Sequence, residues 1–271
     1  MRHLRLGITL IVISVFALLI LDFLPGPWVS NTRYVNSTIS YVILGITFYV
    51  ATHLLGLPSL EYFRLPRFHF KTGIALLIAS MFIVLEITGS DNVHLKPTIA
   101  LRGLIFLLVL GFGEEMVSRA LVFGALRKFG QWRAIVISSF LFGLLHINVY
   151  IGSHWDSWLA YWHVMDTFAW AIFTCTLMIV TRSIWVAVIF HALSDWSIVF
   201  DKATPTSSTV EKYNPSLWEG ITSPFFNGLI YVLMASLLLW VNRGTVPRWM
   251  MRLAIKFKLV ETKYEQGVLL A

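Results

Sequence analysis

Two adjacent carboxylates, Glu114 and Glu115, lie inside a long apolar stretch and are followed at helical spacing by Arg119. A charged side chain at the centre of a bilayer costs about 2.5–3.5 kcal/mol on insertion scales, so such groups mark functional sites or paired charges. Glu115 and Arg119 stand four residues apart, the spacing of an ion pair on one helix face. Glu114 lies about 100° further around the helix, so we expect the two carboxylates not to share one small pocket. Glu114 is then the carboxylate available for chemistry.

Three further ionisable residues, His146, His191 and Asp195, lie in two later apolar stretches. Counted from the nearest basic residue at one end of each stretch, Glu114, His146 and Asp195 lie 13 residues in, and His191 lies nine residues in. At 1.5 Å per helical residue, these positions correspond to depths of about 20 Å and about 14 Å. We therefore expect the four groups to meet at one level of a helix bundle and to form an acid/base site.

The composition identifies the elements that must position these groups. Hydrophobic residues make up 57% of the 271 residues, charged residues 13%, and the mean hydropathy is +0.75. Soluble domains carry about 25% charged residues, so this chain has too little polar surface to cover a water-soluble globule. We expect an all-α polytopic membrane helix bundle of about eight transmembrane helices, forming a single integral membrane domain over residues 1–271. The predicted spans are 6–24, 38–57, 72–89, 98–127, 133–150, 158–181, 183–200 and 224–242.

The distribution of lysine and arginine predicts the orientation. With both termini in the cytoplasm, fifteen of the 21 basic residues fall on the cytoplasmic side, and four fall on the opposite side. This bias predicts an N-in/C-in topology, with the acid/base site open to the cytoplasmic side. The net charge of +7 is spread over short loops and a basic tail. Anionic lipid headgroups account for that charge, so we expect a lipid bilayer and no nucleic acid as the partner.

Three motifs follow one another in the apolar stretches: Glu-Glu-Met-Val-Ser-Arg at 114–119, Phe-Gly-Leu-Leu-His at 142–146 and His-Ala-Leu-Ser-Asp at 191–195. They resemble the EExxxR, FxxxH and HxxxN/D motifs of the CPBP (Abi) family. That family comprises CAAX prenyl proteases and bacteriocin-processing and bacteriocin-immunity proteins. The resemblance covers residues 98–200, the expected catalytic core. It implies an intramembrane endopeptidase that cleaves a peptide or prenylated protein near the cytoplasmic leaflet. The membrane would be the plasma (inner) membrane of a prokaryote or the endoplasmic reticulum of a eukaryote.

The resemblance also implies roles for individual residues. Glu114 and His146 would hold and activate a water, and His191 with Asp195 would stabilise the oxyanion. Asparagine is frequent at the last motif position, and ionised Asp195 cannot donate a hydrogen bond as an amide does. We therefore expect Asp195 to position His191 and to favour its imidazolium, so that Asp195→Asn retains activity. The residues implied to be structural or orienting are Glu115, Arg119 and Phe142.

Metal dependence is left open by these residues. Glu114, His146 and His191 could hold zinc with an open fourth position, which would make the protein a metalloendopeptidase. Against this, the chain has no HExxH motif, and a water activated by a glutamate needs no ion. We expect a site without a metal or other cofactor, and zinc is the alternative.

Two other functions are compatible with buried ionisable residues. A transporter or proton relay also places carboxylates and histidines inside the membrane, although the chain lacks repeated halves. A non-catalytic bacteriocin-immunity or scaffold protein is the other alternative, and the complete motifs argue against it. We expect His53 and His163 to be packing residues and Glu86 to be interfacial or paired. Asp166 could line the same cavity, but its neighbours in the sequence do not indicate a role.

Overall fold

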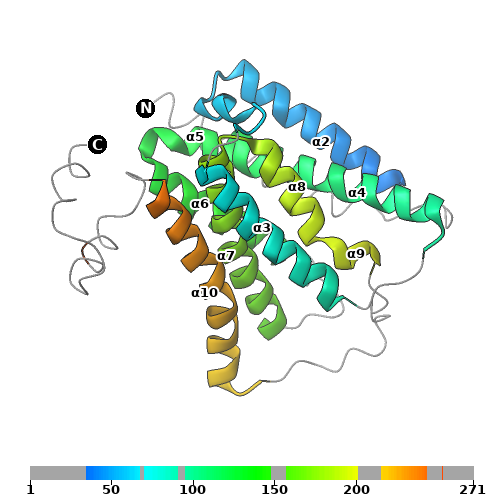
Figure 1. The fold of residues 1–271 in the computed structure, drawn as a ribbon, viewed down its shortest axis with the longest axis vertical. Coiled ribbons are helices and arrows are strands. Elements are labelled where there is room, and N and C mark those ends of the chain that lie inside the picture. The colour runs from blue at the N-terminus through cyan, green and yellow to red at the C-terminus, as the bar shows by residue number, and fades with distance from the viewer. Residues whose placement is uncertain are drawn as a thin grey trace.

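A computed structural model describes residues 35–67, 70–90, 95–147, 157–200, 215–242 and 252. Within these ranges the regular structure is helical, and no β-strand is present (Figure 1). The predicted all-α fold is therefore confirmed for the described part of the chain. The first predicted span, 6–24, lies outside it.

Each of the other seven predicted spans overlaps one or more helices. Three of the described helices are long and apolar enough to cross a membrane, namely α3, α7 and α10, and shorter apolar helices accompany them. The count of eight spans and the N-in/C-in orientation stay predictions. The helices are α2 (Val35–Leu54), α3 (Phe70–Gly89), α4 (Pro97–Glu115), α6 (Gln131–Leu145), α7 (Ser157–Thr181), α8 (Ile184–Ser194), α9 (Trp196–Phe200) and α10 (Leu217–Val241).

The fourth predicted span is not one regular helix. After α4 the chain continues as a π-helical segment, η2 (Met116–Phe123), then as the short α5 (Gly124–Leu126) and the 3₁₀ turn η3 (Arg127–Phe129). The π-helical segment begins directly after the paired glutamates. Wide turns of this kind are rare and occur mostly at functional sites, because they change the direction of the side chains around them.

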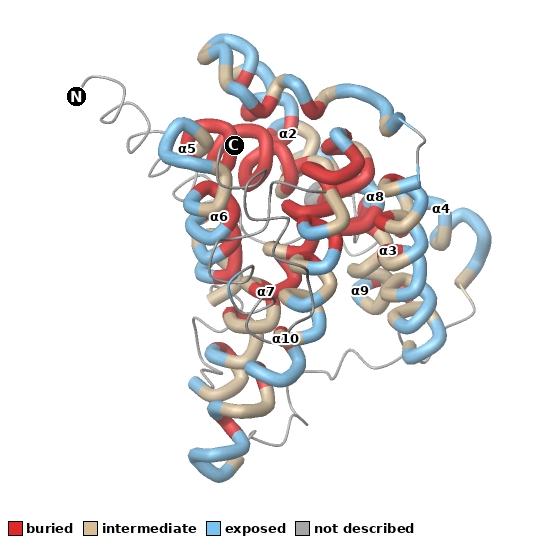
Figure 2. Tube along the Cα trace, turned by 60° about the vertical axis from the view of Figure 1, so that its left-hand side comes forward, coloured by how far each residue is buried: buried red, intermediate tan, exposed pale blue. Residues whose placement is uncertain are grey.

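Helix α7 lies inside the bundle, whereas α3 and α10 lie at its periphery. Of the most apolar window of each helix, 78% is buried within the protein for α7, 17% for α3 and 28% for α10. Figure 2 shows the buried segments gathered in the interior and the exposed segments on the outer helices. The outward side chains of α3 include Leu77, Met81 and Leu85. Apolar faces that remain exposed in this way fit an integral membrane protein, in which lipid covers them.

Two glycines allow helices to approach closely beside the motif residues. A Cβ on Gly111 of α4 would lie 2.9 Å from the carbonyl oxygen of Val188 in α8, and one on Gly143 of α6 would lie 2.7 Å from that of Val164 in α7. Neither position has room for a larger residue. The close contacts bring α4 against α8 and α6 against α7.

The basic turns gather at one end of the bundle, where α2, α5, α7 and α10 end and α3, α6 and α8 begin (Figure 1). We call this the basic end. The described lysines and arginines there are Arg64, Arg67, Lys71, Arg127, Lys128, Arg133 and Arg182.

Candidate active site

His191 is the centre of the site and is almost fully buried between α8 and α4. Its Nδ1 lies 2.8 Å from Glu115 Oε1. Its Nε2 lies 3.6 Å from Glu114 Oε2 and 3.4 Å from Asp195 Oδ2. Both glutamates contact this ring, although neither is among the lining residues of the cavity beside it. The two nitrogens lie on different edges of one imidazole, so side chains about 100° apart on α4 both reach the ring.

Glu115 connects His191 to Arg119. The predicted ion pair is confirmed, with Arg119 Nε 3.1 Å from Glu115 Oε2 and both side chains buried. The guanidinium also donates to the hydroxyl of Ser118 at 2.6 Å and to the carbonyl of Ala171 in α7 at 3.2 Å. Glu115 therefore does more than brace α4, because it accepts from both the histidine and the arginine.

Aromatic rings enclose this polar network. The Arg119 guanidinium carbon lies 4.7 Å from the ring centroid of Phe142 and 5.8 Å from that of Trp170. The Trp170 ring meets the His191 ring edge to face at 4.7 Å between centroids, and Phe142 meets it at 5.8 Å. Phe142 thus has the orienting position expected from its motif. Trp170 was not predicted, although it continues the face of α7 that carries His163 and Asp166 at helical spacing.

His146 stands at the C-cap of α6, where the helix ends. Its Nδ1 lies 2.9 Å from the carbonyl oxygen of Phe142. A carbonyl only accepts, so Nδ1 carries the proton and the lone pair of a neutral ring is on Nε2. Its neighbour is His163 of α7, at 5.3 Å between ring centroids.

Glu114 lies against His191 on one side and Tyr41 of α2 on the other. The Tyr41 hydroxyl donates to Glu114 Oε1 at 3.3 Å. The Glu114 side chain is 14% exposed, whereas that of Glu115 is fully buried. Glu114 is thus the more accessible of the two, as expected, and its cooperation with His146 stays a prediction. The tyrosine had no signal in the sequence, since α2 contains no motif.

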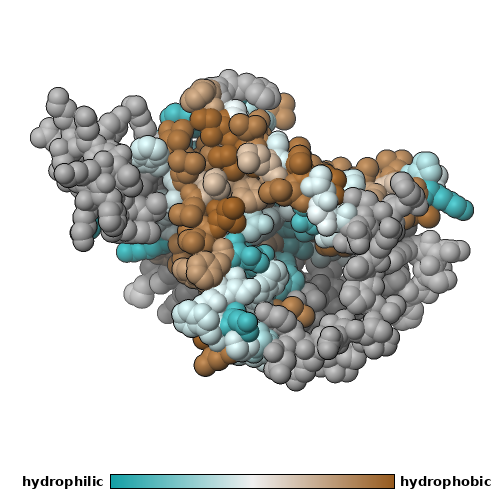
Figure 3. Space-filling model, turned by 60° about the horizontal axis from the view of Figure 1, so that its bottom comes forward, coloured by the Kyte–Doolittle hydropathy of each residue, from teal (hydrophilic) through white to brown (hydrophobic). Residues whose placement is uncertain are grey.

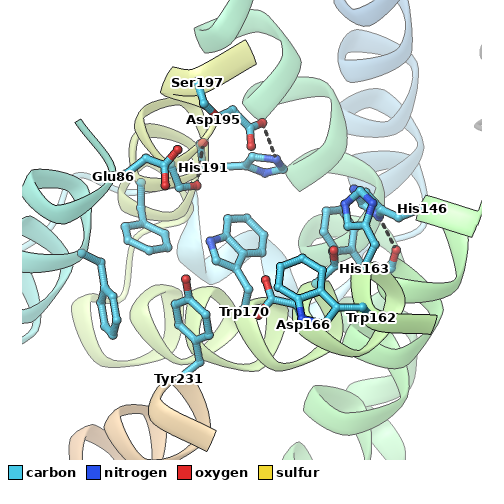
Figure 4. Close-up of a pocket in the computed structure, with 15 residues that line it drawn as sticks. Glu86, His146, Trp162, His163, Asp166, Trp170, His191, Asp195, Ser197 and Tyr231 are labelled. Atoms are coloured by element: carbon cyan, nitrogen blue, oxygen red, sulfur yellow. Dashed lines mark hydrogen bonds and ion pairs between the residues drawn. The ribbon is translucent and has the colours of Figure 1, made fainter. Parts of the chain in front are cut away.

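A cavity of about 300 Å³ lies beside His191 (Figure 4). Six acidic or histidine side chains line it, and no lysine or arginine is among its described lining residues. His163 faces this cavity and not a packed interior, and Glu86 and Asp166 face it as well. The six are Glu86, His146, His163, Asp166, His191 and Asp195.

Two carboxylates that line the cavity lie far from the basic end. Glu86 is 16 residues from the start of α3, and Asp166 is 15 residues from the end of α7, or about 22–24 Å from that end. Figure 3 brings the opposite end forward and shows hydrophilic side chains beside a hydrophobic surface. The end of the bundle toward which the cavity opens stays a prediction.

The alternative zinc set does not fit the arrangement. Among the residues that the structure describes, no group of three or more histidine, cysteine or acidic side chains could hold a metal ion. Glu114, His146 and His191 are therefore not arranged as three ligands of one ion.

Comparison with known proteins identifies the family of the central segment. Residues 96–197 match the family model described as type II CAAX prenyl endopeptidase, Rce1-like. Searches of curated proteins and of solved structures found no match. The matched range contains all three motifs and every residue of the His191 network described above except Tyr41. Residues 96–197 thus match the Rce1-like family model, which confirms the resemblance to the CPBP family.

Proposed function

We propose that the protein is an intramembrane endopeptidase that hydrolyses a peptide bond with a water activated by Glu114 and His146. One observation carries the proposal: Glu114 contacts His191, and His191 lines a cavity together with His146. A base, a second imidazole and space for a substrate segment are thus adjacent. The peptidase family of residues 96–197 agrees with this chemistry.

Each polar residue of the site has one role in the proposed reaction. Glu114 takes a proton from water as the water oxygen attacks the carbonyl carbon, and later returns that proton to the leaving amine. His146 accepts a hydrogen bond from the same water through Nε2, because Nδ1 is committed to Phe142. A protonated His191 donates from Nε2 to the oxyanion that forms on the carbonyl oxygen. Glu115 holds Nδ1 of that ring, and Asp195 keeps the proton on Nε2.

The side from which the peptide arrives is a separate part of the proposal. The sequence predicts cleavage near the cytoplasmic leaflet, and the cavity argues against it. If the basic end faces the cytoplasm, the cavity lies toward the opposite leaflet. We therefore place the access of the peptide at the end opposite the basic end. A peptide on the non-cytoplasmic side then fits better than a prenylated protein in the cytoplasm.

Peptidase activity is tested with the purified full-length chain in detergent. A fluorogenic membrane peptide and a farnesylated CAAX peptide serve as substrates, and Glu114→Ala, His146→Ala and His191→Ala are compared with His53→Ala. His53 is an exposed histidine outside the cavity and is the matched control. Loss of general acid–base catalysis lowers turnover about 10²–10⁴-fold, and the control should remain active. Turnover that survives all three site changes would show that the site is misassigned.

A proton relay is the second candidate, because six acidic or histidine side chains line one cavity. Liposomes that contain the protein and a pH-sensitive dye distinguish the two functions. A proton flux that is lost in Glu114→Ala, in a protein that cleaves neither substrate, would favour the relay. Cleavage without flux would favour the peptidase.

A further inference from the structure

A second cavity, of about 450 Å³, lies at the basic end and is separate from the site around His191. It forms where η1 (Pro58–Tyr62), the start of α3, η3 and the turn between α7 and α8 meet. Five cationic side chains line it, and Glu61 is the one acidic residue among its lining. The cations are Arg64, Arg67, Lys71, Arg127 and Arg182.

Two of the cations that line this cavity have no carboxylate partner among the described residues. Glu61 forms an ion pair with Arg127, whose guanidinium also lies over the Tyr62 ring at 5.4 Å. Among the described residues, no carboxylate is paired with Arg64 or Arg182. A negatively charged ligand would provide the partner that Arg64 and Arg182 lack.

Arg182 occupies a backbone position that favours glycine. Its φ is 53°, in the left-handed region, whereas the other two described residues with positive φ are Gly56 and Gly130. A side chain in that region is uncommon and strained, and such strain is found where a side chain serves a function. At this turn the strained residue lines the cavity with a guanidinium, the group best suited to bind phosphate oxygens.

An apolar surface adjoins the cations. Leu65 lines the cavity and is 80% exposed, and Phe70, at the start of α3, is 82% exposed. Helix α3 itself faces outward along its length. Cations beside an outward apolar face match an amphiphile better than a free anion, because the acyl chains can lie along that face.

We propose that this cavity binds the phosphate headgroup of an anionic lipid, with its acyl chains along α3. The proposal does not depend on the peptidase function. It also fits the predicted orientation, since the basic end would face the leaflet that is rich in anionic lipids.

Native mass spectrometry of the purified full-length chain tests the proposal. The protein is titrated in detergent with phosphatidylglycerol or with phosphatidylcholine, and the bound lipid is counted for wild type, Arg64→Gln, Arg182→Gln and the double variant. Arg133→Gln is the matched control, an exposed arginine at the same end that does not line the cavity. We expect wild type to prefer phosphatidylglycerol, each cavity change to weaken its binding about five-fold, and the double change about 25-fold. The control should bind as wild type does.

Three outcomes would overturn the assignment. Equal binding of the two lipids would show that the cavity does not recognise an anionic headgroup. Equal loss in the control and in the cavity variants would show a diffuse charge effect. Inorganic phosphate that competes as strongly as the lipid would identify a site for a free anion. Because both arginines are exposed, the variants should fold, and a melting temperature equal to that of wild type verifies this.

Discussion

Replacement of Arg119 by methionine tests whether the buried ionic network holds the active-site helices together. The Arg119 side chain is 1% exposed, and the substitution removes the pair with Glu115 at 3.1 Å and the hydrogen bond to Ala171 at 3.2 Å. It leaves the fully buried Glu115 with His191 as its remaining charged partner. Breaking a buried pair on one side costs about 3–5 kcal/mol. For a chain of this size, that corresponds to a fall in the melting temperature of about 6–20 °C.

The assay is thermal unfolding of the detergent-solubilised protein, followed by circular dichroism, for Arg119→Met, Glu115→Gln and the double variant. Arg133→Met is the control, because Arg133 is exposed and its loss should cost less than about 0.5 kcal/mol. In a coupled network the double variant is destabilised by less than the sum of the single changes, with a difference of about 0.5–3 kcal/mol. Single effects that simply add, or an Arg119→Met protein as stable as the control, would refute the reasoning.

Three further outcomes follow from the site and its packing. Asp195→Asn should keep most of the peptidase activity. Asp195→Ala should lower that activity about 10–100-fold, because the contact that orients the His191 imidazole is gone. Equal loss of activity in both variants would mean that the negative charge itself is required. Gly111→Ala should destabilise the protein by about 1–3 kcal/mol, since its Cβ would meet the backbone of α8, whereas Gly73→Ala, with no neighbour within 4 Å, should be neutral or stabilising in thermal unfolding. The side of the membrane is tested in intact cells with a membrane-impermeant thiol reagent and protein whose native cysteine has been replaced. Ser197→Cys at the active-site cavity should react directly, and Lys71→Cys at the basic end should react only after the cells are permeabilised. The reverse pattern would place the cavity on the cytoplasmic side.

The sequence determined the helices and the neighbours along each helix. Apolar stretches near the length of a membrane span predict helices, because a backbone in lipid must satisfy its own hydrogen bonds. The four-residue spacing of Glu115 and Arg119 predicted their ion pair, which the structure contains. Both results depend on the fixed geometry of a single helix, and the local sequence is sufficient to state it.

The tertiary structure decided which side chains meet across helices. Glu114 and Glu115 both reach His191 because Gly111 lets α8 approach α4 closely. No sequence pattern predicted the π-helical segment that follows the two glutamates. Trp170 completes the site from α7, a helix without a recognised motif. The rotation and height of one helix relative to another are set by the packing of whole surfaces, which no local spacing encodes. The same packing also decides that Glu86 of α3 and Asp166 of α7, which have no motif, line the cavity beside His191.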